Sequence, residues 1–145
     1  MHPKSYLQIY FTITIMKKKG SVVEFTQQRN EELLSAFREQ LSFLGELPLE
    51  QIFTRASLSP ASRFWVSERR AMVVMSHMMK GDQLLSMNQK RREMFYEIFR
   101  RVKELLRLEP SLTLTEASFR AVNSPAPEFY LTPKSARVLI YRLRA

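Results

Sequence analysis

Apolar residues recur at helical spacing in two successive stretches of the chain. The first stretch predicts a helix over residues 27–44, because its large apolar residues share one face and Gly45 follows as a stop signal. That face carries Leu33, Leu34, Phe37, Leu41 and Leu44. Pro48 favours the first turn of a second helix that ends near Leu58. Ser67 is then expected to cap a third helix.

The third helix and the second stretch continue the same order. The buried face expected for the third helix comprises Ala71, Val74, Met75, Met78 and Met79. In the second stretch, a longer apolar helix is interrupted at Pro110. Thr113 and Glu116 form a capping-box pattern that opens the next helix, and Thr132 before Pro133 opens the last one. The pattern therefore predicts six helices in two sets of three.

A nine-residue motif occurs twice, 65 residues apart. Residues 59–67 read Ser-Pro-Ala-Ser-Arg-Phe-Trp-Val-Ser, and residues 124–132 read Ser-Pro-Ala-Pro-Glu-Phe-Tyr-Leu-Thr. The first helices of the two sets align in a register of 62, which places Phe99 opposite Phe37. An internal repeat of this kind indicates duplication of one structural unit.

Two aromatic residues recur inside this motif. We expect Phe64 and Phe129 to fill the core, and Trp65 and Tyr130 to pack at its edge. Aromatic residues at matching positions of a helical repeat more often set the angle between helices than stack on bases. The motif itself is therefore predicted to be structural.

The predicted fold is all-α, with two tandem three-helix units related by internal duplication and packed together. Residues 1–25 form a tail, residues 26–81 the first unit and residues 82–145 the second unit. A unit of roughly 60 residues buries only about 60% of its unfolded surface, so the two units should pack against each other.

The tail has several interpretations. Residues 6–15 are apolar but reach only half of the ~20 residues that a membrane span needs. One hypothesis places the true start at Met16, with residues 1–15 as an upstream extension. An edge strand and a disordered tail are the alternatives.

The chain is basic, and its charge is unevenly spread along the sequence. The formal net charge is +9 and the isoelectric point is near 10.2. Residues 26–81 hold seven Lys and Arg against six acids, whereas residues 82–145 hold twelve against seven. A basic balance favours polyanionic partners, nucleic acid first. The chain has no Cys, which argues against thiolate metal sites and favours a cytoplasmic location.

Catalytic patterns are missing from the sequence. The chain has two His residues, and His77 has no carboxylate at a spacing that would orient it as a base or a metal ligand. No Gly-rich phosphate loop and no nucleophile elbow is present. We therefore expect no enzyme activity, no metal, no cofactor, no membrane association and no small-molecule substrate.

A three-helix unit whose last two helices meet at a defined turn, with a basic outer face on the last helix, resembles the helix-turn-helix architecture of bacterial regulators and tandem Myb-like repeats. The resemblance covers residues 27–145 and rests on helix order and charge. The connection here is about eight residues long, whereas the usual turn is short and contains Gly.

The resemblance implies a DNA-binding surface on the third helix of each unit. Base or phosphate contacts are expected from the last helix through Lys134, Arg137, Tyr141, Arg142 and Arg144. The corresponding helix of the first unit offers Arg69 and Arg70. Phosphate contacts are also expected from the fourth helix through Arg91, Arg92, Arg100 and Arg101.

Two classes of function remain open from the sequence. The first is a DNA-binding protein, a bacterial or phage regulator or a mobile-element accessory, in which the near-neutral first unit braces the second or dimerises. The second is a helical protein-interaction adaptor with no nucleic-acid role, whose partner is a protein or a second copy of the chain. The uneven charge favours the first class.

Overall fold

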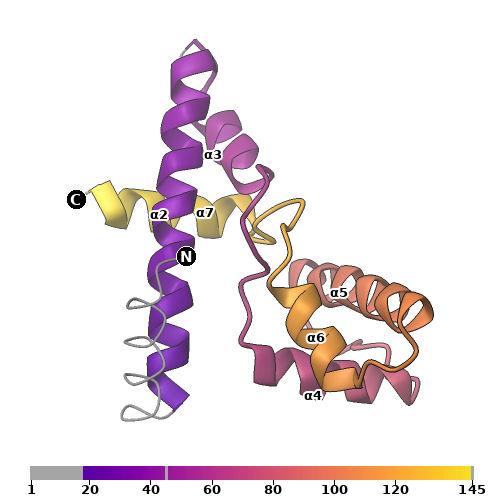
Figure 1. Cartoon of the computed structure of the whole chain (residues 1–145). Helices are drawn as coiled ribbons and strands as arrows, with labels where there is room; N and C mark the ends of the chain where they lie inside the picture. Colours follow the sequence, from indigo (N-terminus) through magenta and orange to yellow (C-terminus); the bar gives the residue numbers. More distant parts are fainter. Residues whose placement is uncertain (1–17, 45, 145) are drawn as a thin grey trace.

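Six α-helices make up the computed structural model, which describes residues 18–44 and 46–144 (Figure 1). The helices are α2 (Lys18–Leu44), α3 (Leu49–Ser57), α4 (Glu68–Met79), α5 (Gln89–Leu108), α6 (Leu114–Val122) and α7 (Pro133–Arg144). Within the described residues no strand is present, and the only β-type pairing is one isolated bridge. The predicted all-α class is confirmed.

The helix boundaries follow the capping signals of the sequence. The Ser67 hydroxyl accepts the backbone N–H of Arg70 at 3.1 Å, and Thr113 and Glu116 form the predicted capping box. Gly81 has a φ of 100°, which a Cβ would disfavour, and ends the turn after α4. One boundary differs, since α2 begins at Lys18 and includes residues that the sequence placed in the tail. Residues 1–17, with the hypothesis about Met16, lie outside the described residues.

The helices pack in a different grouping from their order along the chain. Helix α7 contacts α2 and α3, which also contact each other, and we call these three helices the α2 lobe. Helices α4, α5 and α6 contact one another and form the α5 lobe. Each lobe therefore contains the third helix of the other sequence unit, and Figure 1 shows the lobes joined by two chain segments. The expectation of three consecutive helices per packed unit is corrected by this exchange.

The exchange is possible because each connection between second and third helices is ten residues long. We call residues 58–67 and 123–132 the crossing segments. Ten extended residues span up to about 33 Å, enough to carry a helix from one lobe to the other. A short turn containing Gly would have returned α4 onto α3. The repeated Ser-Pro-Ala motif thus lies in a segment that connects the two lobes, and not in a tight turn between adjacent helices.

The crossing segments bind each other through reciprocal backbone hydrogen bonds. The N–H of Ala61 donates to the carbonyl of Ala126 at 3.0 Å, and the N–H of Ala126 donates to the carbonyl of Ala61 at 2.9 Å. Two further amides donate to carbonyls at helix ends, Phe64 to Val122 and Phe129 to Ser57, each at 3.0 Å. Each of these hydrogen bonds has a counterpart in which donor and acceptor are replaced by the residues 65 positions away in the sequence. The two crossing segments are therefore related by a local two-fold axis. A common origin of the two halves stays a prediction from the sequence.

The repeated aromatic residues of one crossing segment stack on those of the other. The rings of Phe64 and Tyr130 stack with centroids 6.0 Å apart, and those of Trp65 and Phe129 stack at 6.1 Å. Both phenylalanines are fully buried, whereas Tyr130 is half-buried. Burial, followed by the charges of nearby carboxylates, raises the pKa of Tyr130 to about 12. Phe64 and Phe129 fill the core and Tyr130 packs at its edge as predicted, whereas Trp65, also expected at the edge, is buried. Each stack joins one crossing segment to the other.

Replacing Thr113 by Ala should lower the free energy of unfolding by about 1 kcal/mol, because α6 would lose its N-cap. The Thr113 hydroxyl accepts the N–H of Glu116 at 3.1 Å, and the Glu116 carboxylate accepts the N–H of Thr113 at 3.0 Å. Urea denaturation measures the change. Thr115→Ala is the matched control, because Thr115 is exposed inside α6 and is expected to leave stability unchanged. Equal losses in both variants would contradict a role for the cap.

Candidate nucleic-acid interface

The outer surface of α7 exposes four of the five residues predicted there. These are Lys134, Tyr141, Arg142 and Arg144. Lys134 and Arg142 form no ion pair with the side chains that the structure describes. The Tyr141 ring also packs on Phe53, with centroids 5.4 Å apart, so part of this side chain serves the α2 lobe. The free cations of α7 are therefore Lys134 and Arg142.

Two predicted residues of α7 contact the other helices of the α2 lobe, namely the half-buried Arg137 and the exposed Arg144. The Arg137 Nη1 lies 3.2 Å from Oε1 of Glu50 on α3. The Arg144 guanidinium lies over the ring of Phe37 on α2, 5.5 Å from its centroid. Both contacts follow from the helix exchange, which places α7 against helices of the first sequence unit. The predicted basic face of α7 is thus only partly available to a polyanion.

A second group of predicted residues lies where α4 and α5 begin. Arg69 and Arg70 belong to the first turn of α4, and Arg91 to the first turn of α5, which packs against α4. We call Arg69, Arg70 and Arg91 the arginine cluster. All three are exposed, and none pairs with a carboxylate among the described residues.

The arginine cluster carries positive charge where the backbone is already positive. Ser67 caps the N–H of Arg70 at 3.1 Å and Asn88 caps the N–H of Arg91 at 2.9 Å, so both arginines occupy the third helical position. Helix N-termini favour anions and disfavour cations by about 0.3–1 kcal/mol. Partial burial over the Phe95 ring lowers the pKa of Arg91 below its usual value, and the charge of Arg70 lowers it further. The acid in the first turn of α4, Glu68, pairs with Arg63, so the cluster has no ion-pair partner among the described residues.

The remaining predicted residues of α5 are engaged within the protein. Arg100 pairs with Glu97 at 2.7 Å, and its hydrogen bond holds the pKa of that carboxyl below its usual range. Arg92 is half-buried, and its Nη2 lies 3.5 Å from the carbonyl of Met87. Arg101 also bonds to Glu97, at 2.8 Å, and points into the second crossing segment. Arg101 thus joins α5 to the second crossing segment and Arg92 joins it to the preceding turn, whereas Arg100 pairs within α5 itself.

Two residues that differ between the copies of the motif form different ion pairs. Arg63 pairs with Glu68 at 3.5 Å and donates hydrogen bonds to the carbonyls of Phe64 and Val66. Glu128, at the equivalent position, pairs with Lys90 at 2.8 Å. The Arg63 and Glu128 side chains carry opposite charges, and each forms an ion pair with a residue of the α5 lobe.

The helix exchange also changes the charge distribution expected from the sequence. The α2 lobe, residues 18–57 and 133–144, holds nine Lys and Arg against six acids. The α5 lobe, residues 68–122, holds eleven against seven. The near-neutral first unit of the sequence is therefore not a near-neutral lobe, because α7 brings four basic residues to it. Both lobes carry a surplus of positive charge.

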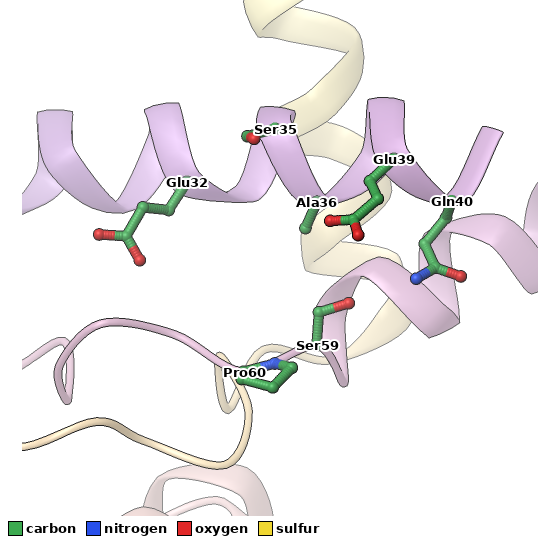
Figure 2. Close-up of a pocket in the computed structure, with 7 residues that line it drawn as sticks. All are labelled: Glu32, Ser35, Ala36, Glu39, Gln40, Ser59 and Pro60. Carbon is green, nitrogen blue, oxygen red and sulfur yellow. The ribbon is translucent and has the colours of Figure 1, made fainter. Parts of the chain in front are cut away.

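Sequence reasoning missed a groove between α2 and the first crossing segment. Its walls include Glu39 on α2 and Ser59 and Pro60 in the crossing segment (Figure 2). The one signal available was the difference between Glu39 and Arg101, which are equivalent in the register of 62. The sequence alone did not indicate that Arg101 contacts Ser124 and Pro125, so this difference could not predict the groove.

Across residues 18–44 and 46–144, no three His, Asp or Glu side chains gather closely enough to hold a metal ion. None of the six helices combines the length and the apolar character that crossing a membrane requires. His77 is exposed on α4.

Comparison with known proteins adds no relative to this picture. No protein-family model matches the chain, and no curated protein or solved structure matches it significantly.

Proposed function

We propose that this protein binds double-stranded DNA, with the arginine cluster contacting the phosphate backbone. The observation that carries the proposal is that Arg70 and Arg91 occupy the N-termini of two packed helices, near enough for the charge of Arg70 to lower the pKa of Arg91, without an ion-pair partner among the described residues. Like charges at two positive helix ends destabilise a fold unless an anion compensates them. Phosphate groups suit this position, because helix N-termini and arginine side chains both favour them.

The third helix of the other lobe supports the same proposal. Helices α4 and α7 follow equivalent crossing segments, and each presents exposed basic residues in its first turn, Arg69 and Arg70 on α4 and Lys134 on α7. Arg142 adds a further free cation on α7. A duplex offers phosphates on both strands, so two basic helices on linked lobes can bind one polyanion together. A role as a regulator or accessory protein in the cytoplasm belongs to this proposal.

The test is the salt dependence of binding to a random-sequence DNA duplex. Fluorescence anisotropy should show affinity that falls steeply between about 50 and 200 mM salt. The double variant Arg70→Ala/Arg91→Ala should lower the log-log slope by about 2, because each lost phosphate contact removes about one unit. Lys134→Ala/Arg142→Ala should lower it by a similar amount if α7 shares the duplex.

The control for charge is Arg107→Ala/Arg120→Ala. Both arginines are exposed, but they pair with Glu104 and Glu109. This variant removes the same net charge and should leave the slope nearly unchanged. A loss equal to that of the cluster variant would mean that only total charge matters. Absence of duplex binding at low salt would overturn the proposal and favour the protein-interaction class.

A further inference from the structure

The groove along α2 has the size of a binding site. Its volume is about 480 Å³, within the roughly 300–1,000 Å³ usual for ligand sites. It runs beside α2 from Glu32 to Gln40, and its opposite wall is Ser59 and Pro60, where the chain leaves α3. Figure 2 shows Glu39 and Gln40 reaching from α2 toward Ser59.

The equivalent position in the α5 lobe is filled by an arginine of the chain itself. Arg101 Nη1 donates to the Ser124 hydroxyl at 2.9 Å and to the carbonyl of Pro125. Its Nε donates to Glu97 at 2.8 Å, and its guanidinium lies 4.9 Å from the centroid of the Phe64 ring. One guanidinium thus joins α5 to both crossing segments.

The acceptors that hold Arg101 have counterparts in the groove. Ser59 and Pro60 correspond to Ser124 and Pro125 in the register of 65, and Glu39 corresponds to Arg101 in the register of 62. The groove is therefore the counterpart of the Arg101 position, with an acid in place of the arginine. A guanidinium from elsewhere would meet the same hydroxyl and the same carbonyl.

The hydroxyl groups at both positions donate to a carbonyl of the preceding helix, three residues back for Ser124 and four residues back for Ser59. Ser124 donates its hydrogen to the carbonyl of Ala121 at 2.6 Å, which leaves its oxygen free to accept from Arg101. Ser59 donates to the carbonyl of Arg55 at 2.9 Å, and its oxygen has no donor among the described residues. The serine of the groove is thus pre-oriented as an acceptor.

Glu39 supplies the charge that a guanidinium needs. Its side chain is exposed and has no hydrogen bond or ion pair with any side chain that the structure describes. At the Arg101 position the carboxylate comes from Glu97, whose counterpart in α2 is Ser35. The carboxylate has moved by one helical turn, from the position of Ser35 to that of Glu39. Glu32 is already occupied, since it accepts the N–H of Ser62 at 2.9 Å.

We propose that this groove binds an arginine side chain of a partner polypeptide, held by Glu39, the Ser59 hydroxyl and the Pro60 carbonyl. The planar guanidinium fork can donate to several acceptors at once, which the point charge of a lysine does less well. The length of the groove along α2, about 12 Å from Glu32 to Gln40, accommodates a peptide segment beside the arginine. This binding does not use the arginine cluster, which lies in the other lobe.

The binding test uses the whole protein and a short blocked peptide with one central arginine, followed by amide chemical shifts in NMR. We expect shifts at Glu39, Ser59 and neighbouring residues of α2. The matched peptide with citrulline, which is neutral but equal in shape, should bind at least about tenfold more weakly, since it loses the charge-assisted bonds. A lysine peptide should also bind more weakly.

Two variants separate this groove from other acidic surfaces. Glu39→Gln should weaken binding of the arginine peptide about tenfold, whereas Glu46→Gln should leave it unchanged, because Glu46 is exposed outside the groove. Equal binding of the arginine and citrulline peptides, or shifts confined to other surfaces, would overturn the proposal. Free arginine that binds as tightly as the peptide would overturn the assignment to a polypeptide.

A further variant tests the equivalence of the two positions without any ligand. Ser35→Glu/Glu39→Arg rebuilds the Glu97 and Arg101 pair in α2, so it should raise Tm by about 3 °C or more and abolish peptide binding. Glu46→Gln, which changes the net charge by the same one unit, should do neither. An unchanged or lowered Tm together with retained peptide binding would show that the groove is not the counterpart of the Arg101 position.

Discussion

Replacing Phe64 by Ala should lower the free energy of unfolding by about 3–5 kcal/mol, the usual range for a large side chain removed from a core. Phe64 is fully buried, stacks on Tyr130 and carries the Arg101 guanidinium over its ring. Its backbone N–H also donates to Val122 of the α5 lobe. The substitution would therefore leave a cavity where the crossing segments and α5 meet. Urea denaturation followed by circular dichroism measures the loss.

The matched control is Phe43→Ala. Phe43 is 75% exposed near the end of α2, so its removal should change stability by no more than about 0.5 kcal/mol. Phe129→Ala should resemble Phe64→Ala, because Phe129 is equally buried and occupies the equivalent place in the crossing. If Phe64→Ala were as mild as Phe43→Ala, the crossing could not be a packed core element.

Local sequence signals predicted the helices well, because caps and apolar stripes act within a few residues. Ser67 and Thr113 cap α4 and α6 as predicted, and the stripe of Ala71, Val74 and Met75 is buried. Met79, expected on the same stripe, is 46% exposed at the last residue of α4. An apolar stripe shows that one face of a helix is buried, but it does not show which other helix packs against that face. The exchange of α4 and α7 therefore lay beyond the pattern.

The candidate site was predicted less completely for the same reason. The outward positions of Lys134 and Arg142 follow from the helical period of α7 alone. The engagement of Arg137 with Glu50, and of Arg101 with Ser124, depends on segments far away in the sequence. No single-helix pattern could distinguish a free arginine from one that serves the fold. Three-dimensional contacts decide which basic residues remain available for a partner.

A chain that ends at Gly81 should lose cooperative folding as a monomer. It would contain α2, α3 and α4, but α4 contacts neither α2 nor α3 in the whole protein, and α7 would be absent. The buried faces of α4 and of the α2–α3 pair would both be exposed to water. Small units with little buried surface are unstable alone, so the far-UV circular dichroism should show a broad, non-cooperative transition.

A chain of residues 58–132 is the matched control for that truncation. It contains α4, α5 and α6 with both crossing segments, so every helix pair of the α5 lobe is kept. It should unfold cooperatively, although it is of similar length to the first fragment.

Mixing the fragment that ends at Gly81 with a separate chain of residues 82–145 should restore the cooperative transition, since α7 and the α5–α6 pair then become available to their partners. A fragment ending at Gly81 that folds cooperatively as a monomer, shown by sedimentation, would mean that α4 can return onto α2 and α3. The exchange would then be one of two accessible packings of the third helix, and the ten-residue crossing segments would permit it without requiring it.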